Sequence, residues 1–220
     1  MATANEPGLI IDLVAFFQTG GIWMYPILLV LVAGVFIGIE RYFFLQSTTS
    51  RNSKVWDELF PLLTKGNFKQ ALEIAKGSNT FMGNIIGAGL ARASTARRTE
   101  DIELAMEEAL MEVLPRLEKR THYLSTLANV ATLLGLLGTI IGLIHAFTAV
   151  ASADPAEKAN MLSAAVGEAM NCTAFGLVTA IPMLVLFSFL QSKAGETVAS
   201  FEAASVKCLN VIRQLSTRAE

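Results

Sequence analysis

Three long stretches of almost uninterrupted apolar residues alternate with polar stretches along the chain. The first contains 18 consecutive residues without a charged side chain, Ile22 to Ile39, which would extend about 27 Å as a helix. That length matches the hydrocarbon core of a bilayer. Trp23 and Tyr25 near one end and Tyr42 near the other are placed as an aromatic belt would be. The pattern predicts three transmembrane helices, over residues 22–45, 124–151 and 162–191.

The polar stretch between the first two spans also carries helical signals. Residues 46–123 show apolar positions at helical spacing, which Pro61 and the run KGN at 65–67 should interrupt. Thr99, followed closely by acidic residues, is a predicted helix start. Pro115 should kink the helix that follows without ending it, so we expect one continuous helix to run on into the second span.

Composition agrees with a membrane location. The chain is 53% hydrophobic and only 16% charged, which is too apolar for an ordinary soluble domain. We therefore expect an all-α integral membrane protein with three transmembrane helices that extend into a cytoplasmic helical bundle. A net charge of −2 without a basic stripe gives no indication of nucleic-acid binding. The two cysteines, Cys172 and Cys208, are expected to be free thiols.

The distribution of basic residues predicts the orientation. Of 17 Lys and Arg residues, segment 46–123 holds eleven and the tail over 192–220 holds four, whereas residues 1–21 hold none. Cytoplasmic loops carry the excess of Lys and Arg. Segment 46–123 and a C-terminal helix over 192–220 are thus predicted to be cytoplasmic. The N-terminus and the short loop over 152–161, which closes a hairpin of the second and third spans, then face the periplasm.

The segment over residues 1–21 leaves two interpretations open. Its stretch LIIDLVAFF places apolar residues on most of a short helix, with Asp12 as the only charge. It is either an outward-facing helix on the membrane interface or a simple extension of the first span.

The second span has two distinct faces when its residues are placed at 100° intervals. Ser125, Asn129, Thr132 and Thr139 share a polar face, in which Leu136 fills the gap. Small residues form the adjacent face, and such residues let helix backbones approach closely in lipid. They are Ala131, Gly135, Gly138 and Gly142.

The third span carries an acidic residue, Glu168, near its start. A charged carboxyl near a helix centre costs roughly 2.5–3.5 kcal/mol in lipid, so Glu168 is expected to face protein or water. Asn171 lies at the edge of its face, and Thr173 lies on a flank. The residues within about 40° of Glu168 are Cys172, Phe175 and Thr179.

Most of these polar residues also have simpler interpretations. Serine and threonine in a span often bond their own backbone, which would be enough to explain Thr132, Thr139 and Thr179. Asn129 and Asn171 can simply hold helices together. For His145, alone among apolar residues, a structural or interfacial role is favoured over a role as a proton relay. Glu168 differs, because an acid in a span without a basic partner in any span is a candidate functional residue.

No motif points to an enzyme. The sequence has no metal-ligand cluster, no Ser-His-Asp grouping near an interface and no phosphate loop, so we expect no catalysis, metal or cofactor. The small-residue face and the polar stripe favour several copies packed in a ring with polar stripes inward. Such a ring would hold one Glu168 per copy, and these would repel one another unless a counter-group enters the centre.

Three stretches resemble a known family. They are GGIWMYPILL with IERYFFL in the first span, NVATLLGLLGTIIGLIHAF in the second and GEAMNCTAFGLVTAIP in the third. In order and spacing, over nearly the whole chain, they resemble the ExbB/TolQ/MotA family of ion-driven membrane proteins, on the ExbB/TolQ side. The MotA branch, which has four spans and no Glu at this place, fits less well.

The resemblance implies a function and partners. It implies a proton-conducting, stator-like subunit of the bacterial inner membrane: a homopentamer around an ExbD/TolR-like single-span partner dimer in a central pore. Proton flow would drive mechanical work, passed to a TonB/TolA-like protein that spans the periplasm. Glu168 matches the essential Glu of the third span, and Thr173 and Thr139 match threonines of the ion pathway. The remaining candidate pore-lining residues are Asn129, Thr132, Asn171 and Thr179.

The chain departs from the family pattern in two ways. The stretch SAAVG before Glu168 lacks the family's usual proline, and His145 and Asn171 stand at positions that are usually apolar. The alternative function is a membrane scaffold that assembles and recruits partners without conducting. Proton flux in liposomes would separate the two hypotheses.

Overall fold

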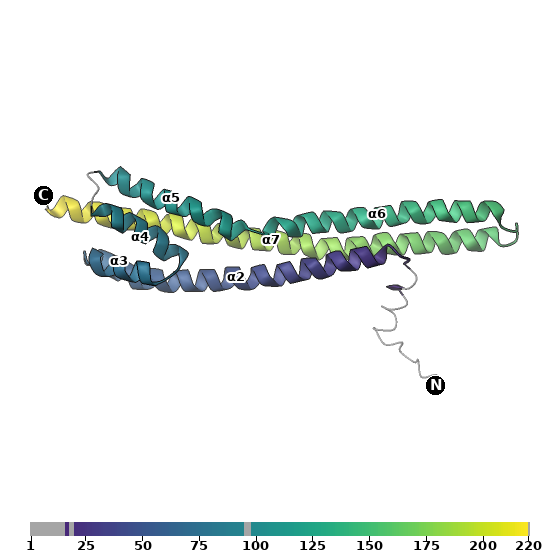
Figure 1. Ribbon diagram of the computed structural model, residues 1–220, viewed down its shortest axis with the longest axis horizontal. Helices are drawn as coiled ribbons and strands as arrows, with labels where there is room; N and C mark the ends of the chain where they lie inside the picture. The colour runs from purple at the N-terminus through teal and green to yellow at the C-terminus, as the bar shows by residue number, and fades with distance from the viewer. Residues whose placement is uncertain (1–15, 18–19, 95–97, 220) are drawn as a thin grey trace, which may run out of the picture. The chain divides into compact units, whose positions relative to one another are not determined.

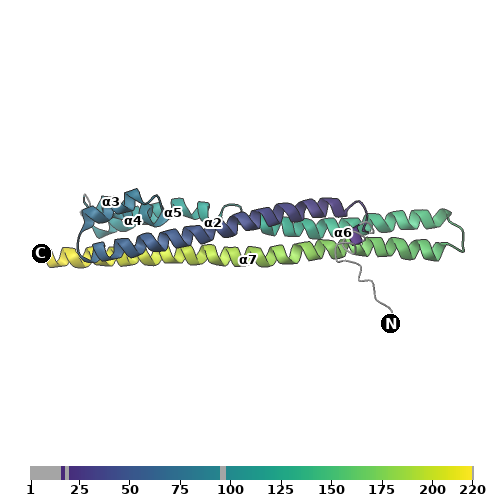
Figure 2. The same cartoon turned by 90° about the horizontal axis from the view of Figure 1, so that it is seen from below.

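The computed structural model describes residues 16–17, 20–94 and 98–219 of the chain. Within these residues the regular secondary structure is helical throughout, so the fold is all-α as predicted. Figures 1 and 2 show the helices in two perpendicular views. Their bounds are α2 Met24–Thr64, α3 Phe68–Gly77, α4 Phe81–Ala93, α5 Thr99–Glu118, α6 Thr121–Ser152 and α7 Lys158–Ala219.

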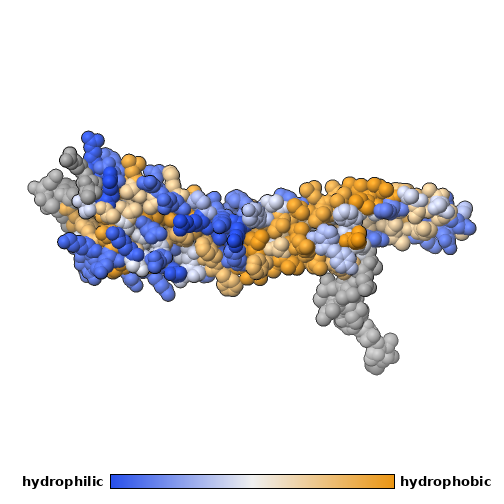
Figure 3. All heavy atoms as spheres, in the orientation of Figure 1, coloured by the Kyte–Doolittle hydropathy of each residue, from blue (hydrophilic) through white to orange (hydrophobic). Residues whose placement is uncertain are grey.

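The chain divides into two compact units. The apolar unit comprises Met1–Gly38 and His122–Phe187, and the polar unit comprises Ile39–Thr121 and Ser188–Glu220. Helix α2, the α5–α6 stretch and helix α7 are each long and apolar enough to cross a membrane. Figure 3 shows the strongly hydrophobic surface that parts of these helices present. The chain is therefore an all-α membrane protein, and the span boundaries given by the sequence remain predictions.

Small residues bring α6 and α7 close together in the apolar unit. A Cβ atom added to Gly135 would lie 3.2 Å from Thr173 Cα and 3.3 Å from Gly176 Cα, both on α7. Further along, a Cβ on Gly142 would lie 3.1 Å from Ala169 Cβ. The small-residue face of the second span is thus confirmed as a close-packing face. Its partner is α7 of the same chain.

The core of the apolar unit lies where α2 meets this helix pair. Buried Ile27 and Val30 of α2 pack with Ala128, Cys172 and Met183. Large apolar side chains elsewhere on the three helices point away from this core and are exposed, as lipid contact requires. They include Leu29, Phe36, Leu133, Phe147, Val178 and Val185.

The prediction of one continuous helix through Pro115 into the second span is wrong. Helix α5 ends at Glu118 and α6 begins at Thr121, because Arg120 has a left-handed φ of 66° that a continuous helix cannot include. Pro115 is accommodated within α5. The Arg120 guanidinium donates to both carboxylate oxygens of Glu40, at 3.0 and 2.9 Å. A charged pair therefore accompanies the interruption.

The prediction that Pro61 interrupts a helix is also wrong. Helix α2 continues through Pro61 to Thr64, so the helix accommodates the one backbone hydrogen bond that this proline cannot donate. The interruption predicted at 65–67 is confirmed: Gly66 has a φ of 74°, and the Asn67 side chain caps α3. The predicted helix start at Thr99 is confirmed as well.

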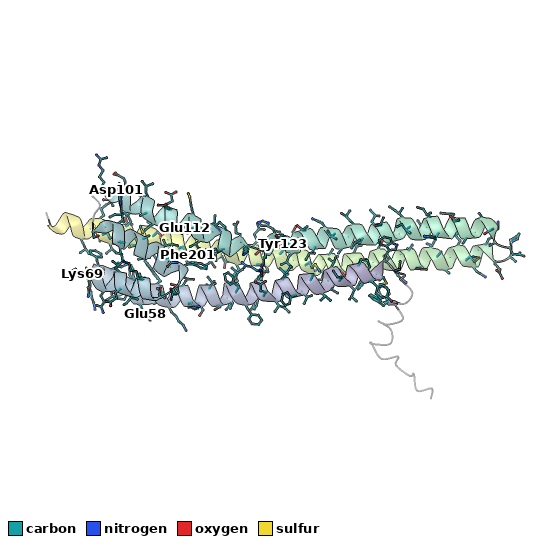
Figure 4. The ribbon with its side chains drawn as sticks, viewed as in Figure 1. Glu58, Lys69, Asp101, Glu112, Tyr123 and Phe201 are labelled. Atoms are coloured by element: carbon teal, nitrogen blue, oxygen red, sulfur yellow. The ribbon has the colours of Figure 1, made fainter. Side chains whose placement is uncertain are left out.

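In the polar unit, α4 packs against α3 and α5, and the predicted helical bundle remains a prediction. Phe201 of α7 is fully buried, whereas the charged side chains of Glu58, Lys69 and Glu112 are exposed (Figure 4). A hydrogen bond joins α2 to the start of α4: Asn52 Oδ1 of α2 accepts it from the Met82 backbone N–H of α4, at 2.7 Å. The cytoplasmic location of this unit remains a prediction.

The predicted N-terminal helix over residues 1–21 lies mostly outside the described residues. Phe16 and Phe17 are described, and both are helical. Their rings contact Phe175 of α7, with ring centroids 6.4 and 5.6 Å apart. The choice between an interfacial helix and an extension of the first span therefore stays open.

Both cysteines are free, as predicted, and both are buried. Burial raises the pKa of the Cys208 thiol from its ordinary 9.0 to about 12. The thiolate is the reactive form of cysteine. At a pH below both pKa values, this shift lowers the fraction of Cys208 present as thiolate about a thousandfold. In a Cys172→Ala background, we expect a maleimide to label Cys208 at least about a hundredfold more slowly in the folded protein than after denaturation. Equal labelling rates would contradict this burial.

Candidate functional site

A cavity of about 350 Å³ lies in the apolar unit between α6, α7 and the turn that precedes α2. We call it the Glu168 cavity. Glu168 of α7 and His145 of α6 line it from facing helices, and Gly21 lines it from the turn. Cys172 and Gly138 also line it. The surrounding walls are mostly apolar, so the carboxyl and the imidazole are its chemically active groups.

The turn before α2 lies directly against the Glu168 carboxyl. Gly21 has a φ of 75°, a conformation that favours glycine. A Cβ at this position would collide with Glu168 Oε1, so the carboxyl rests against the bare backbone of the turn. Within a single chain, the Glu168 carboxyl thus lies against this turn and beside the cavity, and that it faces protein or water in the membrane remains a prediction. The residue is exposed towards the cavity and not packed in the core.

Replacing Gly21 by alanine should reduce proton flux through the assembled complex at least about tenfold, because the new methyl group displaces the Glu168 carboxyl. Gly66→Ala is the matched control. Gly66 has nearly the same φ, 74°, but its Cβ would make only an ordinary contact with Leu215, at 3.6 Å. Both variants should lose similar thermal stability, measured by thermal unfolding. Equal flux in the two variants would show that the contact with Glu168 is unimportant.

The two threonines of the predicted ion pathway meet directly. Thr139 of α6 and Thr173 of α7 hydrogen-bond to one another through their hydroxyl oxygens. Both hydroxyl oxygens also lie within hydrogen-bonding distance of the Gly135 carbonyl oxygen, at 3.0 Å from Thr139 and 2.9 Å from Thr173. The absence of a side chain on Gly135 is what lets Thr173 approach this carbonyl. The result is a compact hydroxyl pair between the helices.

The hydroxyl pair and the Glu168 cavity are neighbours, but the threonines do not line the cavity. Cys172 lies between the two: it lines the cavity, precedes Thr173 in sequence and is only 2% exposed. Its Sγ occupies the space that a side chain on Gly138 would take. A close contact between Cys172 and Gly138 therefore separates the carboxyl from the hydroxyl pair.

The other candidate pore-lining residues do not join this site. Asn129 and Thr132 are exposed on α6, and the Thr132 hydroxyl donates to the Ala128 carbonyl of its own helix at 3.1 Å. Asn171 is half-buried. Thr179 is only 1% exposed, and its hydroxyl has no hydrogen-bond partner among the residues that the structure describes. In a single chain, Thr179 thus belongs to the interior of the apolar unit.

His145 and Gly21 were missed as members of the site. The helical spacing of α6 could have identified His145, because Gly138, Gly142, His145 and Ala149 recur at intervals of four, three and four residues. All four line the cavity. The role of Gly21 depends on a turn that contacts α7 far away in sequence, and no local pattern reveals such a contact. Among the described residues, no group of three or more potential ligands could hold a metal ion.

Comparison with known proteins gives one family. The model of the MotA/TolQ/ExbB proton channel family matches residues 77–203, which is more than half of the chain. The matched segment includes α6, the hydroxyl pair and Glu168.

Individual relatives are similar over different shares of the chain. An ExbB-like biopolymer transport protein of Synechocystis sp. is 27% identical over 202 residues, which cover 90% of this chain and 78% of that protein. The biopolymer transport protein ExbB of Aquifex aeolicus is 29% identical over 133 residues, which cover 60% of this chain and 87% of that protein. The Tol-Pal system protein TolQ of Haemophilus influenzae is 37% identical over 86 residues, which cover 39% of this chain and 37% of that protein.

Proposed function

Because the chain belongs to the MotA/TolQ/ExbB proton channel family, we propose that it is the proton-conducting, stator-like subunit of an inner-membrane energy transducer. The family serves transport and energy transduction, and it is not a family of enzymes. The observation that carries the proposal is the position of Glu168: an acidic side chain in an apolar unit, exposed to a cavity, with a hydroxyl pair close by.

Glu168 binds and releases the proton in this proposal. A proton enters the cavity and joins the carboxylate, which leaves a neutral carboxylic acid that apolar surroundings tolerate well. The hydroxyls of Thr139 and Thr173 then serve as donors and acceptors on the far side of Cys172. The distribution of Lys and Arg supports a periplasmic position for residues 153–157, which connect α6 and α7, and for the N-terminus. The C-terminus is then cytoplasmic.

Further subunits complete the path in this proposal. Five copies surround an ExbD/TolR-like pair of single-span helices, which face the polar stripe of α6. Asn129, Thr132 and Leu136 of this stripe are exposed in a single chain, as residues available to other subunits should be. The partner supplies the counter-group that relieves repulsion among the Glu168 carboxylates. A TonB/TolA-like protein carries the work across the periplasm.

The energy available per proton limits the mechanism. Moving one charge across the membrane releases about 2.3 kcal/mol per 100 mV. Each mechanical step therefore needs several protons, which agrees with a ring that holds one Glu168 per copy.

Proton flux tests the proposal against a non-conducting scaffold. The complex, purified with its co-expressed single-span partner, is reconstituted in liposomes that contain a pH-sensitive dye. We expect an imposed potential to drive proton entry well above that of protein-free liposomes. A correctly assembled complex that leaves proton entry unchanged would favour the scaffold.

A further inference from the structure

His145 and Glu168 share one cavity, although they lie on different helices and far apart in sequence. Few of the cavity-lining residues have ionisable side chains. Besides these two, Cys172 lines the cavity as a buried thiol, and the turn before α2 contributes only Gly20, Gly21, Ile22 and Trp23. No Lys, Arg or Asp is among the lining residues.

The packing of α6 on α7 fixes the relative depth of the two groups. Gly142 lies against Ala169, and the two helices run in opposite directions on either side of residues 153–157. His145 lies three residues from Gly142 towards that connection, and Glu168 lies one residue from Ala169 in the same direction. The difference of two residues corresponds to about 3 Å along the helix axes. His145 is thus slightly nearer the connection than Glu168.

The surroundings of His145 do not suggest a structural role. The side chain is exposed, and within the described part of the chain it makes no hydrogen bond, ion pair or ring contact. A histidine that held helices together would use its ring nitrogens for such bonds. Ring nitrogens without such bonds, beside a cavity, can instead accept a proton from water and donate one to a neighbouring group.

We propose that His145 is the proton-delivery residue of the Glu168 cavity: it takes a proton from entering water and passes it to the Glu168 carboxylate. In the first step, the neutral imidazole accepts a proton from hydronium, which leaves water and imidazolium. In the second, the imidazolium gives a proton to the carboxylate, directly or through one water molecule. This restores the neutral imidazole and forms the carboxylic acid. The inference rests on the proposed proton-conducting function.

Chemical rescue tests this role. In the liposome assay, His145→Ala should lower proton flux at least about tenfold, because positioned acid–base groups contribute this much or more to proton transfer. Adding imidazole to the buffer should restore much of the lost flux, since the shortened side chain leaves room in a cavity of about 350 Å³. His122→Ala is the matched control. His122, the chain's other histidine, lies outside the cavity beside Phe187, and its replacement should leave flux unchanged.

The outcomes separate this inference from the proposed function. Unchanged flux in His145→Ala would overturn the delivery role, and so would a loss that imidazole does not restore. The delivery role would also be overturned if His122→Ala lost as much flux as His145→Ala and imidazole restored that flux equally well. The proposed function is judged by Glu168→Gln in the same preparation. If Glu168→Gln conducts like the wild type, the conducting role of Glu168 fails, whatever His145 does.

Discussion

Glu168→Gln should reduce proton flux through the reconstituted complex at least about a hundredfold, close to the level of protein-free liposomes. The amide has nearly the shape of the carboxylic acid, but it does not bind and release a proton near neutral pH. Within the described residues, Glu168 makes no hydrogen bond or ion pair whose loss would disturb folding. The variant should therefore assemble normally, as size-exclusion chromatography in detergent can verify.

A second glutamine substitution on the same helix controls for the loss of a negative charge. Glu196 is exposed on α7 in the polar unit, so Glu196→Gln should conduct like the wild type. Full flux through an assembled Glu168→Gln complex would refute the proton-binding role. If the wild type itself does not conduct while the complex assembles, the scaffold function becomes the better explanation.

Gly176→Ala should destabilise the apolar unit by about 1–3 kcal/mol, because it forces a methyl group between two backbones. The added Cβ would lie 2.8 Å from the Ala131 carbonyl oxygen and 3.1 Å from Gly135 Cα, and neither atom can rotate away. As α6 and α7 separate, Thr173 should lose its contact with the Gly135 carbonyl. We expect a lower melting temperature in thermal unfolding, together with reduced flux.

Gly195→Ala is the matched control on the same helix. A Cβ at Gly195 would meet nothing within 4 Å, so this alanine should leave the protein as stable as the wild type or more stable, by up to about 1 kcal/mol. Equal melting temperatures for the two variants would mean that the close approach at Gly176 contributes nothing to stability.

The features that the sequence predicted correctly are those that a single helix encodes. The glycines of α6 recur at helical spacing, so their close-packing face could be deduced without knowing what they contact. Thr139 and Thr173 were both assigned to the ion pathway by resemblance. Their direct hydrogen bond forms only when α6 and α7 are aligned so that the two threonines lie at the same height along the helix pair. The contacts of Gly135 with α7 set this alignment. Sequence spacing within one helix contains no information on that alignment.

The features that were missed depend on contacts between distant segments. The helix break at Arg120 cannot be predicted from the local sequence, because a left-handed residue other than glycine has no clear sequence signal. Its partner Glu40 also lies 80 residues away in the sequence. The same holds for the turn at Gly21, which contacts Glu168. In the sequence His145 is a lone histidine among apolar residues, because its cavity exists only once α6 and α7 are packed together.

The hydroxyl pair also implies a choice among proton arrangements. Two hydroxyl protons serve three contacts: one between Thr139 and Thr173, and one from each hydroxyl to the Gly135 carbonyl. One of these contacts therefore always lacks a proton. When the contact between the hydroxyls is made, either threonine can be the donor, and exchanging the two roles requires only rotation about the two C–O bonds. The pair thus has a reversible polarity that changes without movement of any heavy atom.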